Sequence, residues 1–250
     1  MLTRSELEKN GPPGFTLGQK EKDYVQHWAL SFLARSGFSG VFKGGTALQK
    51  AFALPRYSED LDFTLNNAEP PDFEALAGYL ESAGFRNRPS WKATETTSSY
   101  STKLRVQGPL YNNKPLSECS LSFDFSKREK TTLKPRPTTI NPAYPDLMPY
   151  TIPLMAEKEI AAEKIRAILT RESARDLYDL HYLVRKGNTP SLKLVNEKLA
   201  FYDEEYSFAE FKNKVNGLSK AWKTELAAFT SSEPDYELAK KVVLEAVKKI

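Results

Sequence analysis

The hydrophobic positions change their period along the chain, and this change divides it into two halves. In the first half, short apolar runs alternate with stretches of helical period. Expected helices cover residues 17–37, 46–54 and 71–85. Expected strands cover residues 39–45, 59–65, 91–97, 101–111 and 116–126, the last three as an antiparallel meander. The second half, from residue 156 onward, has helical period throughout, which predicts an N-terminal α/β half and a C-terminal helical half.

A proline-rich segment separates the two halves. Residues 133–153 carry six of the sixteen prolines, a density that helices and central strands do not tolerate. We therefore expect an extended connector over 133–153, an α/β domain over 1–132 and a helical domain over 154–250.

Composition adds few constraints to this picture. The hydrophobic content of 40% and charged content of 27% are typical of a globular protein, and the net charge of +4 permits a polyanionic partner without requiring one. Cys119 is the single cysteine, so no intramolecular disulfide can form. No signal-peptide pattern and no apolar run of membrane-spanning length is present. We expect a cytoplasmic protein without a membrane partner.

Two aspartates interrupt the predicted strand at 59–65. Side chains two residues apart point to one face of a strand, so Asp60 and Asp62 project together while Leu61 and Phe63 point into the core. Neighbouring carboxylates repel each other, and burial of either is costly without compensation. A divalent cation such as Mg²⁺ offers that compensation. The alternative is an exposed strand face with two solvated acids.

Asp124 is a third candidate acid in the same half. In "LSFDFS", three apolar residues share one strand face and Asp124 lies on the other, between Ser122 and Ser126. Asp124 could be a third metal ligand, a base for an attacking hydroxyl or an exposed residue. The basic residues that follow it are solvated or hold an RNA backbone; they are Lys127, Arg128, Lys130, Lys134 and Arg136.

A glycine pair precedes the acids. Gly44 and Gly45 allow backbone N–H groups to approach a ligand closely, and the helix start that follows favours an anion. Thr46 with Gln49 fits a capping box, which is the structural explanation for Thr46. Ser58 could bind a phosphate oxygen or be a turn residue, and Lys43 is expected to be solvated.

"GGTALQK" followed by "RYSEDLDF" resembles the AbiEii-type nucleotidyltransferase toxins, a type IV toxin–antitoxin branch of the DNA polymerase β-like superfamily. The resemblance implies an α/β (α+β) fold, with an N-terminal mixed sheet, flanking helices and a helical C-terminal domain. It also implies that Gly44, Gly45, Thr46 and Ser58 hold the triphosphate. Asp60 and Asp62 would hold Mg²⁺, and Asp124 remains a candidate third ligand or base from its strand position alone.

The helical half contains a lysine on an apolar stripe. Lys164 lies between Ile160 and Ile168 at i±4, so it needs an anionic partner or must reach out to solvent. A substrate triphosphate is one candidate partner, and Glu157 on the same stripe is the other. The resemblance implies that Lys164 and Asp176 complete the active site, with Arg175 and Asp179 as secondary candidates. Asp179 is expected to point further toward solvent.

Taken with these residues, the resemblance implies an Mg²⁺-dependent nucleotidyltransferase toxin. Nucleoside triphosphate (NTP) is the expected substrate, and the 3′ end of tRNA is the expected acceptor. Transfer there would block translation, with an antitoxin as a further partner and phage defence as the setting. Two alternatives stay open: nucleotidylation of a protein side chain, and a non-catalytic nucleotide- or RNA-binding module that acts through a partner.

Overall fold

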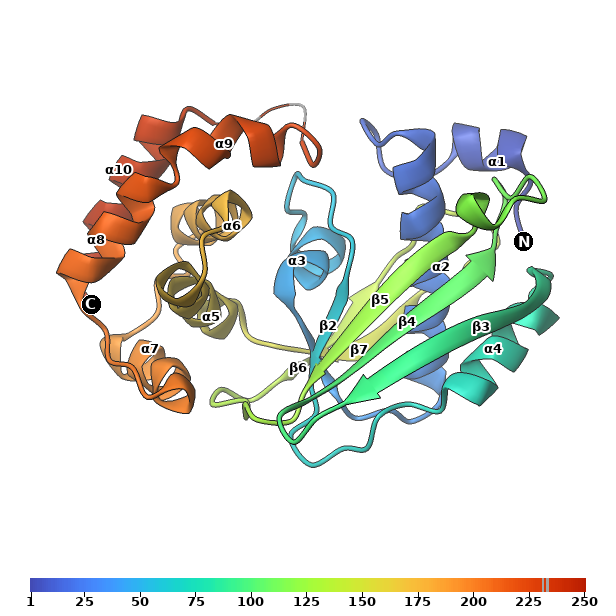
Figure 1. The fold of residues 1–250 in the computed structure, drawn as a ribbon, viewed down its shortest axis with the longest axis horizontal. Coiled ribbons are helices and arrows are strands. Elements are labelled where there is room, and N and C mark those ends of the chain that lie inside the picture. The colour runs from blue at the N-terminus through green and yellow to red at the C-terminus, as the bar shows by residue number, and fades with distance from the viewer. Residues whose placement is uncertain (231, 233) are drawn as a thin grey trace. The chain divides into compact units, whose positions relative to one another are not determined.

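The computed structural model describes residues 1–230, 232 and 234–250, which form two compact units. The first unit, the sheet unit, comprises residues 1–52, 57–130 and 136–154. The second, the helical unit, comprises residues 53–56, 131–135 and 155–250. Division into a mixed α/β part and a helical part confirms the predicted fold class (Figure 1).

The sheet unit is built on a seven-stranded mixed sheet of order β3-β4-β5-β2-β1-β7-β6. Strand pairs β5–β2 and β1–β7 are parallel, and the other neighbouring pairs are antiparallel. The strands are β1 (Val41–Lys43), β2 (Leu61–Thr64), β3 (Arg86–Glu95), β4 (Ser99–Gln107), β5 (Cys119–Ser126), β6 (Arg136–Ile140) and β7 (Tyr150–Leu154).

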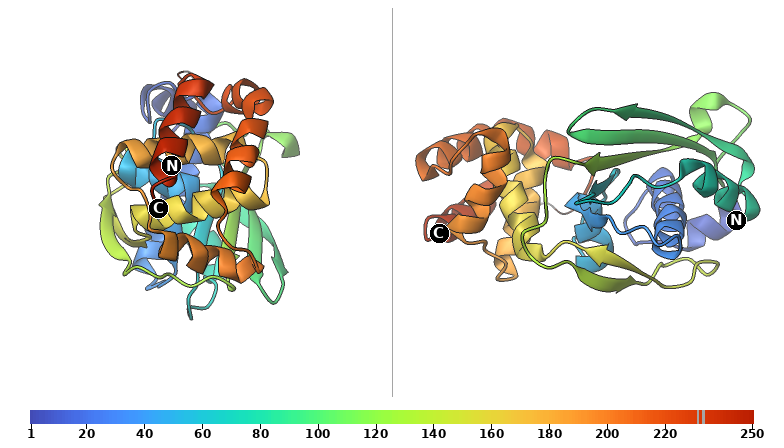
Figure 2. Two further views of the ribbon diagram at one scale, coloured as in Figure 1. Left: turned by 90° about the vertical axis from the view of Figure 1, so that its left-hand side faces the viewer. Right: turned by 90° about the horizontal axis from the view of Figure 1, so that it is seen from below.

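Four helices accompany this sheet: α1 (Arg4–Lys9), α2 (Leu17–Arg35), α3 (Gly44–Phe52) and α4 (Phe73–Ser82). Helix α2 contacts both β5 and β7, and α4 contacts β3. In the right-hand view of Figure 2, the sheet curves around α2, with β3–β5 on one side of the helix and β6 and β7 on the other. The apolar face of the sheet is thereby buried, and its other face carries the polar residues.

The core beneath the candidate acids is aromatic. Phe63 of β2 stacks on Phe125 of β5 at a centroid distance of 5.2 Å, and Phe42 of β1 lies 5.1 Å from Phe63. All three side chains are fully buried. Because side chains alternate along a strand, this packing fixes the register and turns the intervening polar residues to the opposite face.

The proline-rich segment differs from the expected connector. Residues 136–140 and 150–154 are strands β6 and β7, which pair with each other and join the sheet through β1. Pro137 lies directly opposite Pro153. Neither proline has an N–H donor, so the pair suits a position without cross-strand hydrogen bonds, and β6 is an edge strand. These residues therefore belong to the sheet unit.

The helical unit contains α5 (Glu157–Thr170), α6 (Ala174–Arg185), α7 (Leu192–Leu199), α8 (Phe208–Gly217), α9 (Ser219–Leu226) and α10 (Tyr236–Val247). Helix α5 packs against α6, α7 and α8, and α6 packs against α9 and α10. The buried side chains at the centre of this unit include Ile165, Leu180, Phe211, Trp222 and Val243.

Candidate active site

Strands β2 and β5 bring two of the predicted acids side by side. Asp62 and Asp124 are register partners in these adjacent parallel strands, so their side chains lie on the same face of the sheet. The flanking residues Leu61 and Phe63 are fully buried on the other face, as predicted. Ser101 of β4 lies opposite Asp124 and donates a hydrogen bond from its hydroxyl to Asp124 Oδ1 at 2.6 Å.

Asp60 precedes strand β2 and is crowded by negative charge. Burial is the largest cause that raises the pKa of Asp60, and Glu59 and Asp124 raise it further. Lys22 and a hydrogen bond from Ser122 act in the opposite direction without cancelling the shift. The ionised form of Asp60 therefore lacks full compensation from the protein, as expected of a carboxylate that serves a cation.

The glycine turn lies directly against these acids. Gly44 has φ +76°, and a Cβ atom there would lie 2.2 Å from Asp62 Oδ2. Only glycine fits this position, because both the backbone conformation and the approach to Asp62 exclude a side chain. The turn and the acid strand are thus packed together before any ligand binds.

Helix α3 begins at Gly44, which corrects the predicted capping box. Thr46 lies in the first turn, and its hydroxyl donates to the main-chain oxygen of Asp60 at 2.5 Å. Gln49 does not return to the helix start but donates from Nε2 to Asp23 Oδ1 at 2.9 Å. Lys43 is not solvated, since it is buried and its ammonium group pairs with Glu129 at 2.5 Å.

Ser58 lies outside strand β2, which begins at Leu61, and it is buried. Gln26 of α2 donates from Nε2 to the main-chain oxygens of Ser58 and Glu59, at 3.2 and 2.8 Å. The segment that leads into the acid strand is therefore held by a helix from the opposite face of the sheet.

Lys164 belongs to a charge network inside the helical unit. Its ammonium nitrogen lies 2.8 Å from Asp176 Oδ1 and 2.7 Å from Asp179 Oδ2. Arg56 holds the same Asp179 through two hydrogen bonds of 2.6 and 2.7 Å, and Arg171 donates to Asp176 at 2.9 and 3.1 Å. All of these side chains are buried except that of Arg171, which is largely exposed.

This network corrects two expectations. Glu157 is not the partner of Lys164 but accepts a hydrogen bond from Asn188 at 3.1 Å, and Asp179 is fully buried rather than turned toward solvent. Burial alone lowers the pKa of Lys164, but Asp176 and Asp179 outweigh it and raise that pKa. For Asp179 burial acts in the other direction and raises the pKa, but Arg56 and Lys164 have the larger combined effect and bring that pKa below its usual range.

Arg56 is a residue that the sequence reasoning passed over. It is the arginine of the quoted "RYSEDLDF", five residues before Leu61, so the motif itself contained the signal. Two of the basic residues after Asp124 have partners within the sheet unit: Lys127 pairs with Glu95, and Lys130 binds the main-chain oxygen of Asn66 and the side chain of Asn67.

The grouping of the acids bears on the predicted metal site. Within the described part of the chain, no three histidine, cysteine, aspartate or glutamate side chains are grouped so that they could hold a metal ion. The expected assembly of Asp60, Asp62 and Asp124 as three ligands is therefore not seen. A crowded set of carboxylates beside a glycine turn is what the sheet provides.

Comparisons with known proteins bear on this arrangement. The family model "Nucleotidyl transferase AbiEii toxin, Type IV TA system" matches residues 32–247. The chain belongs to the AbiEii nucleotidyltransferase toxin family. It is therefore a nucleotidyltransferase of the toxin type, and the family implies an NTP substrate and an antitoxin partner. Nucleotidyltransferases generally use divalent metal ions.

Solved structures agree with this family fold. MenT4, a nucleotidyltransferase toxin from Mycobacterium tuberculosis, is similar with a TM-score of 0.67 and 20% identity, over 98% of this chain and 88% of that chain. JHP933 from Helicobacter pylori is similar with a TM-score of 0.62 and 20% identity, over 91% of this chain and 89% of that chain. At this identity the likeness shows the shared fold. Comparison of the sequence with curated proteins gave no significant match.

One negative finding concerns membranes. None of the helices in the described part of the AbiEii chain has the length and apolar composition needed to cross a bilayer.

Proposed function

We propose that this AbiEii protein transfers a nucleoside monophosphate from an NTP to the 3′ hydroxyl of an RNA, with the 3′ end of tRNA as the acceptor. The observation that supports this most directly is the pairing of Asp62 with Asp124 on adjacent parallel strands, with Gly44 packed against Asp62. A nucleotide added to the 3′ end of tRNA would cover the hydroxyl that carries the amino acid, and translation would stop. Such an arrest fits a role in phage defence.

Phosphate binding is assigned to the start of α3. The first N–H groups of a helix have no partner within the helix and bind anions well. Gly44 and Gly45 expose these groups because they carry no side chain, and Thr46 contributes the next one. The Thr46 hydroxyl is already engaged by Asp60, so it couples the phosphate turn to the acids. Ser58 belongs to the same proposed set.

The acids supply the second half of the proposed site. Asp60 and Asp62 would hold Mg²⁺, which proteins usually bind through one or two carboxylates together with substrate phosphates, and burial and neighbouring charges leave Asp60 undercompensated. Asp124 is assigned as the base, because no three of these side chains are grouped as metal ligands in the described part of the chain. When bound, Mg²⁺ neutralises triphosphate charge and polarises the α-phosphorus.

Asp124 is also suited to receive a proton. Its Oδ1 accepts the Ser101 hydroxyl, and Oδ2 can take the proton of the attacking hydroxyl. The attacking oxygen then bonds to the α-phosphorus, the bond from that phosphorus to the bridging oxygen breaks, and pyrophosphate leaves.

Lys164 and Asp176 are proposed participants on the strength of the family resemblance. The contacts inside the helical unit explain both residues as members of a charge network. Lys164 would offset triphosphate charge, and Asp176 would orient Lys164 or the acceptor. Lys164→Met, described in the Discussion, tests the role of Lys164.

The test of this function is transfer of label. Purified protein, Mg²⁺ and each α-labelled NTP are incubated with total cellular RNA, and we expect label in RNA together with released pyrophosphate. Asp62→Asn should abolish transfer and the growth arrest caused by expression, while its melting temperature holds because one crowded charge is gone. Asp203→Asn, an exposed aspartate with φ +58°, is the matched control and should remain active.

Three results would count against the proposal. If Asp62→Asn still transfers nucleotide, the proposed carboxylate mechanism is wrong. Label in protein instead of RNA indicates nucleotidylation of a side chain, and absence of pyrophosphate release indicates a non-catalytic module.

A further inference from the structure

The polar face of strands β3, β4 and β5 carries ordered rows of side chains. One row runs from Lys92 through Lys103 to Ser122, because these residues are register partners across the three strands. The next row toward one end is Ser90, Arg105 and Ser120; the next toward the other end is Thr94, Ser101 and Asp124. A row of cations thus lies beside the row that contains the candidate base.

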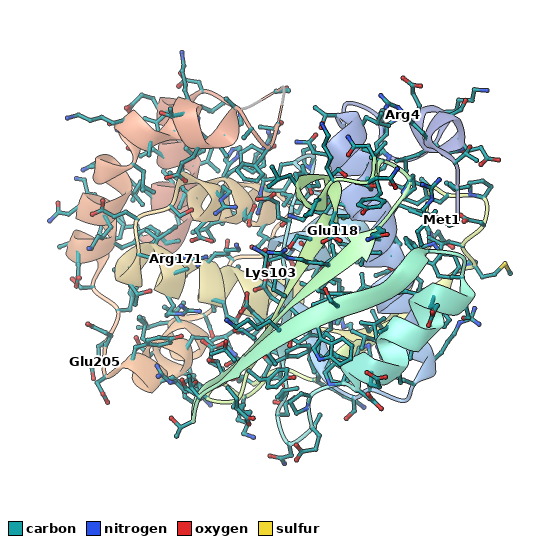
Figure 3. All side chains as sticks on the ribbon, turned by 45° about the vertical axis from the view of Figure 1, so that its right-hand side comes forward. Met1, Arg4, Lys103, Glu118, Arg171 and Glu205 are labelled. Carbon is teal, nitrogen blue, oxygen red and sulfur yellow. The ribbon has the colours of Figure 1, made fainter. Side chains whose placement is uncertain are left out.

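These three cations are exposed to solvent. Among the described residues, no carboxylate lies within ion-pair distance of Lys92, Lys103 or Arg105, and all three are exposed. Figure 3 shows the Lys103 side chain extending away from the sheet. Lys92 and Lys103 stand directly opposite each other, an arrangement that destabilises a sheet. Stability of the sheet therefore does not explain why Lys92, Lys103 and Arg105 are cationic.

The same residues line a hollow in the surface. A depression of about 580 Å³ is bordered by Lys92, Lys103 and Arg105 and reaches Ser122 and Asp124. Serine and threonine hydroxyls fill the spaces between the cations. This combination of spaced cations and hydroxyl donors matches the groups that bind nucleic-acid phosphates and sugars.

The sheet order gives the depression a direction. Strand β1 and the glycine turn lie on one side of the Asp62–Asp124 pair, and strands β4 and β3 lie on the other side. If the triphosphate binds at the glycine turn, the acceptor must approach Asp124 from β4 and β3. Along the strands, Lys103 and Arg105 lie in successive rows of this face. These rows are about 6.8 Å apart because a strand rises ~3.4 Å per residue, and this spacing is comparable to that of phosphates in an extended single strand.

We propose that Lys92, Lys103 and Arg105 form a track that binds the phosphates of a single-stranded RNA and leads its 3′ end to Asp124. This assignment rests on the proposed nucleotidyl transfer, and it names the surface that holds the acceptor. Recognition is by phosphate charge, so the track positions the strand without reading its bases. Lys92, Lys103 and Arg105 are positioning residues in this scheme.

The test compares two triple variants with equal loss of charge. The first is Lys92→Gln/Lys103→Gln/Arg105→Gln. The control is Arg4→Gln/Lys9→Gln/Arg35→Gln, which removes three exposed cations from helices α1 and α2. Both are placed in the Asp62→Asn background, and binding of a fluorescein-labelled single-stranded RNA is followed by anisotropy over a range of salt concentrations. RNA affinity is thereby measured without any requirement for transfer.

We expect the track variant to bind RNA at least about tenfold more weakly and the control to bind like its parent. Loss of three phosphate contacts should also reduce the slope of log K against log salt by about 2, at ~0.7 per contact for a single strand. The melting temperature of the track variant should hold or rise because the opposed lysines are gone. In the active background, KM for RNA should rise while KM for NTP stays unchanged.

Equal RNA affinity and equal salt slope for the two triple variants would overturn the track, even if wild type transfers label to RNA as proposed. A polyglutamate peptide that competes with RNA as strongly as unlabelled RNA does would also overturn it, since the track would then accept acidic protein equally well. A track variant that loses RNA affinity while NTP still raises its melting temperature supports the proposal.

Discussion

At the scale of single residues, Gly44 is the position where the backbone and the site depend on each other most directly. Gly44 and Gly37 share the same φ of +76°, but they differ in surroundings. A Cβ at Gly44 would collide with Asp62, whereas a Cβ at Gly37 would meet nothing within 4 Å. Alanine at Gly37 therefore measures the free-energy cost of the backbone conformation alone, and alanine at Gly44 measures that cost together with the cost of the collision with Asp62.

We expect Gly37→Ala to lower the free energy of unfolding by about 1–2 kcal/mol, the cost of a left-handed conformation for alanine. Gly44→Ala should lower it by more than this and should also abolish transfer, because the carboxylate of Asp62 must move. Urea unfolding of both variants measures the difference. The double variant Gly44→Ala/Asp62→Ala removes the closest atoms and should recover part of that difference. If Gly44→Ala is no less stable than Gly37→Ala, Asp62 does not lie against the turn.

Asp60 gives a second prediction at this scale, through pH. Its folded-state pKa is raised, mainly by burial, so its contribution to stability is present below the unfolded pKa and lost as the pH rises through the folded pKa. Asp60→Asn should therefore melt at a higher temperature than wild type at pH 7, and the gap should close below about pH 4. Melting curves across this range, without metal, test the sign. A variant that is less stable at pH 7 would show that the ionised carboxylate is satisfied by the protein.

The sequence predicted these residues because their signals are local. Alternation in "DLDF" and "SFDF" places the acids opposite the core, and a glycine pair between a strand and a helix indicates a turn for a ligand. The side-by-side position of Asp62 and Asp124 depends on strand pairing across about sixty residues, which alternation cannot supply. The cation track was missed for the same reason, although Lys103 and Arg105 already lie two apart in one predicted strand.

At the scale of elements, the hairpin of α5 and α6 shows the limit of a helical wheel. The wheel placed Lys164 correctly on a buried stripe, but within the protein it could compare this lysine only with residues of its own helix, so Glu157 was the one candidate it offered beside a substrate triphosphate. The partners come from the next helix, and Arg56 joins them from a position more than a hundred residues earlier. Tertiary pairing of this kind has no periodic signature in the sequence.

Lys164→Met should destabilise the protein by about 3 kcal/mol, because removal of one member of a buried ion network leaves carboxylates short of charge. Arg56 and Arg171 still hold the two aspartates, which keeps the loss at the lower end of the usual range. Lys158→Met makes the same change at an exposed position of the same helix and should alter stability little. Thermal melts with and without Mg-NTP measure both variants.

The nucleotide arm of that experiment tests the proposed role in the reaction. If Lys164 offsets triphosphate charge, added Mg-NTP should stabilise Lys164→Met less than it stabilises wild type or Lys158→Met. A destabilised Lys164→Met protein with a full nucleotide response would remove Lys164 from the site and leave it a structural residue.

The proline-rich segment shows a different limit at the element scale. Its prolines argued against strands, yet "RPTTI" and "YTIPL" form β6 and β7. Proline excludes a strand only where its missing N–H is needed, and the edge position together with the Pro137–Pro153 pairing removes that need. Positional context of this kind becomes visible only once the sheet order is known.

At the scale of the whole molecule, two units with separate cores were predictable from the change of period, although their limits were not. Residues 53–56 and 131–135 belong to the helical unit, whereas 136–154 belong to the sheet unit. The chain therefore passes between the units several times. Domain limits are predicted from changes of composition along the sequence, and segments of four or five residues that belong to the other unit are too short to cause such a change.

Cys119 offers a test of whether the two units unfold separately. It is the only cysteine, lies in β5 of the sheet unit, and is buried, which raises the pKa of its thiol. A buried thiol with a raised pKa does not react with Ellman's reagent in the native state. Its reactivity therefore reports the opening of the sheet unit, whereas far-UV circular dichroism at 222 nm reports the helices, most of whose residues lie in the helical unit.

We expect Lys164→Met to shift the helical signal to lower urea concentration while Cys119 stays protected to the same urea concentration as in wild type. The reason is that the ion network lies in the helical unit, and the buried aromatic and aliphatic cluster around Phe63 and Phe123 lies in the sheet unit. Lys158→Met should move neither signal. If Cys119 becomes reactive at the lower urea concentration at which the helices of Lys164→Met unfold, the two units unfold as one cooperative structure. The stability of the acid strand would then depend on the Lys164 network, and loss of activity in this variant could no longer be assigned to the missing charge alone.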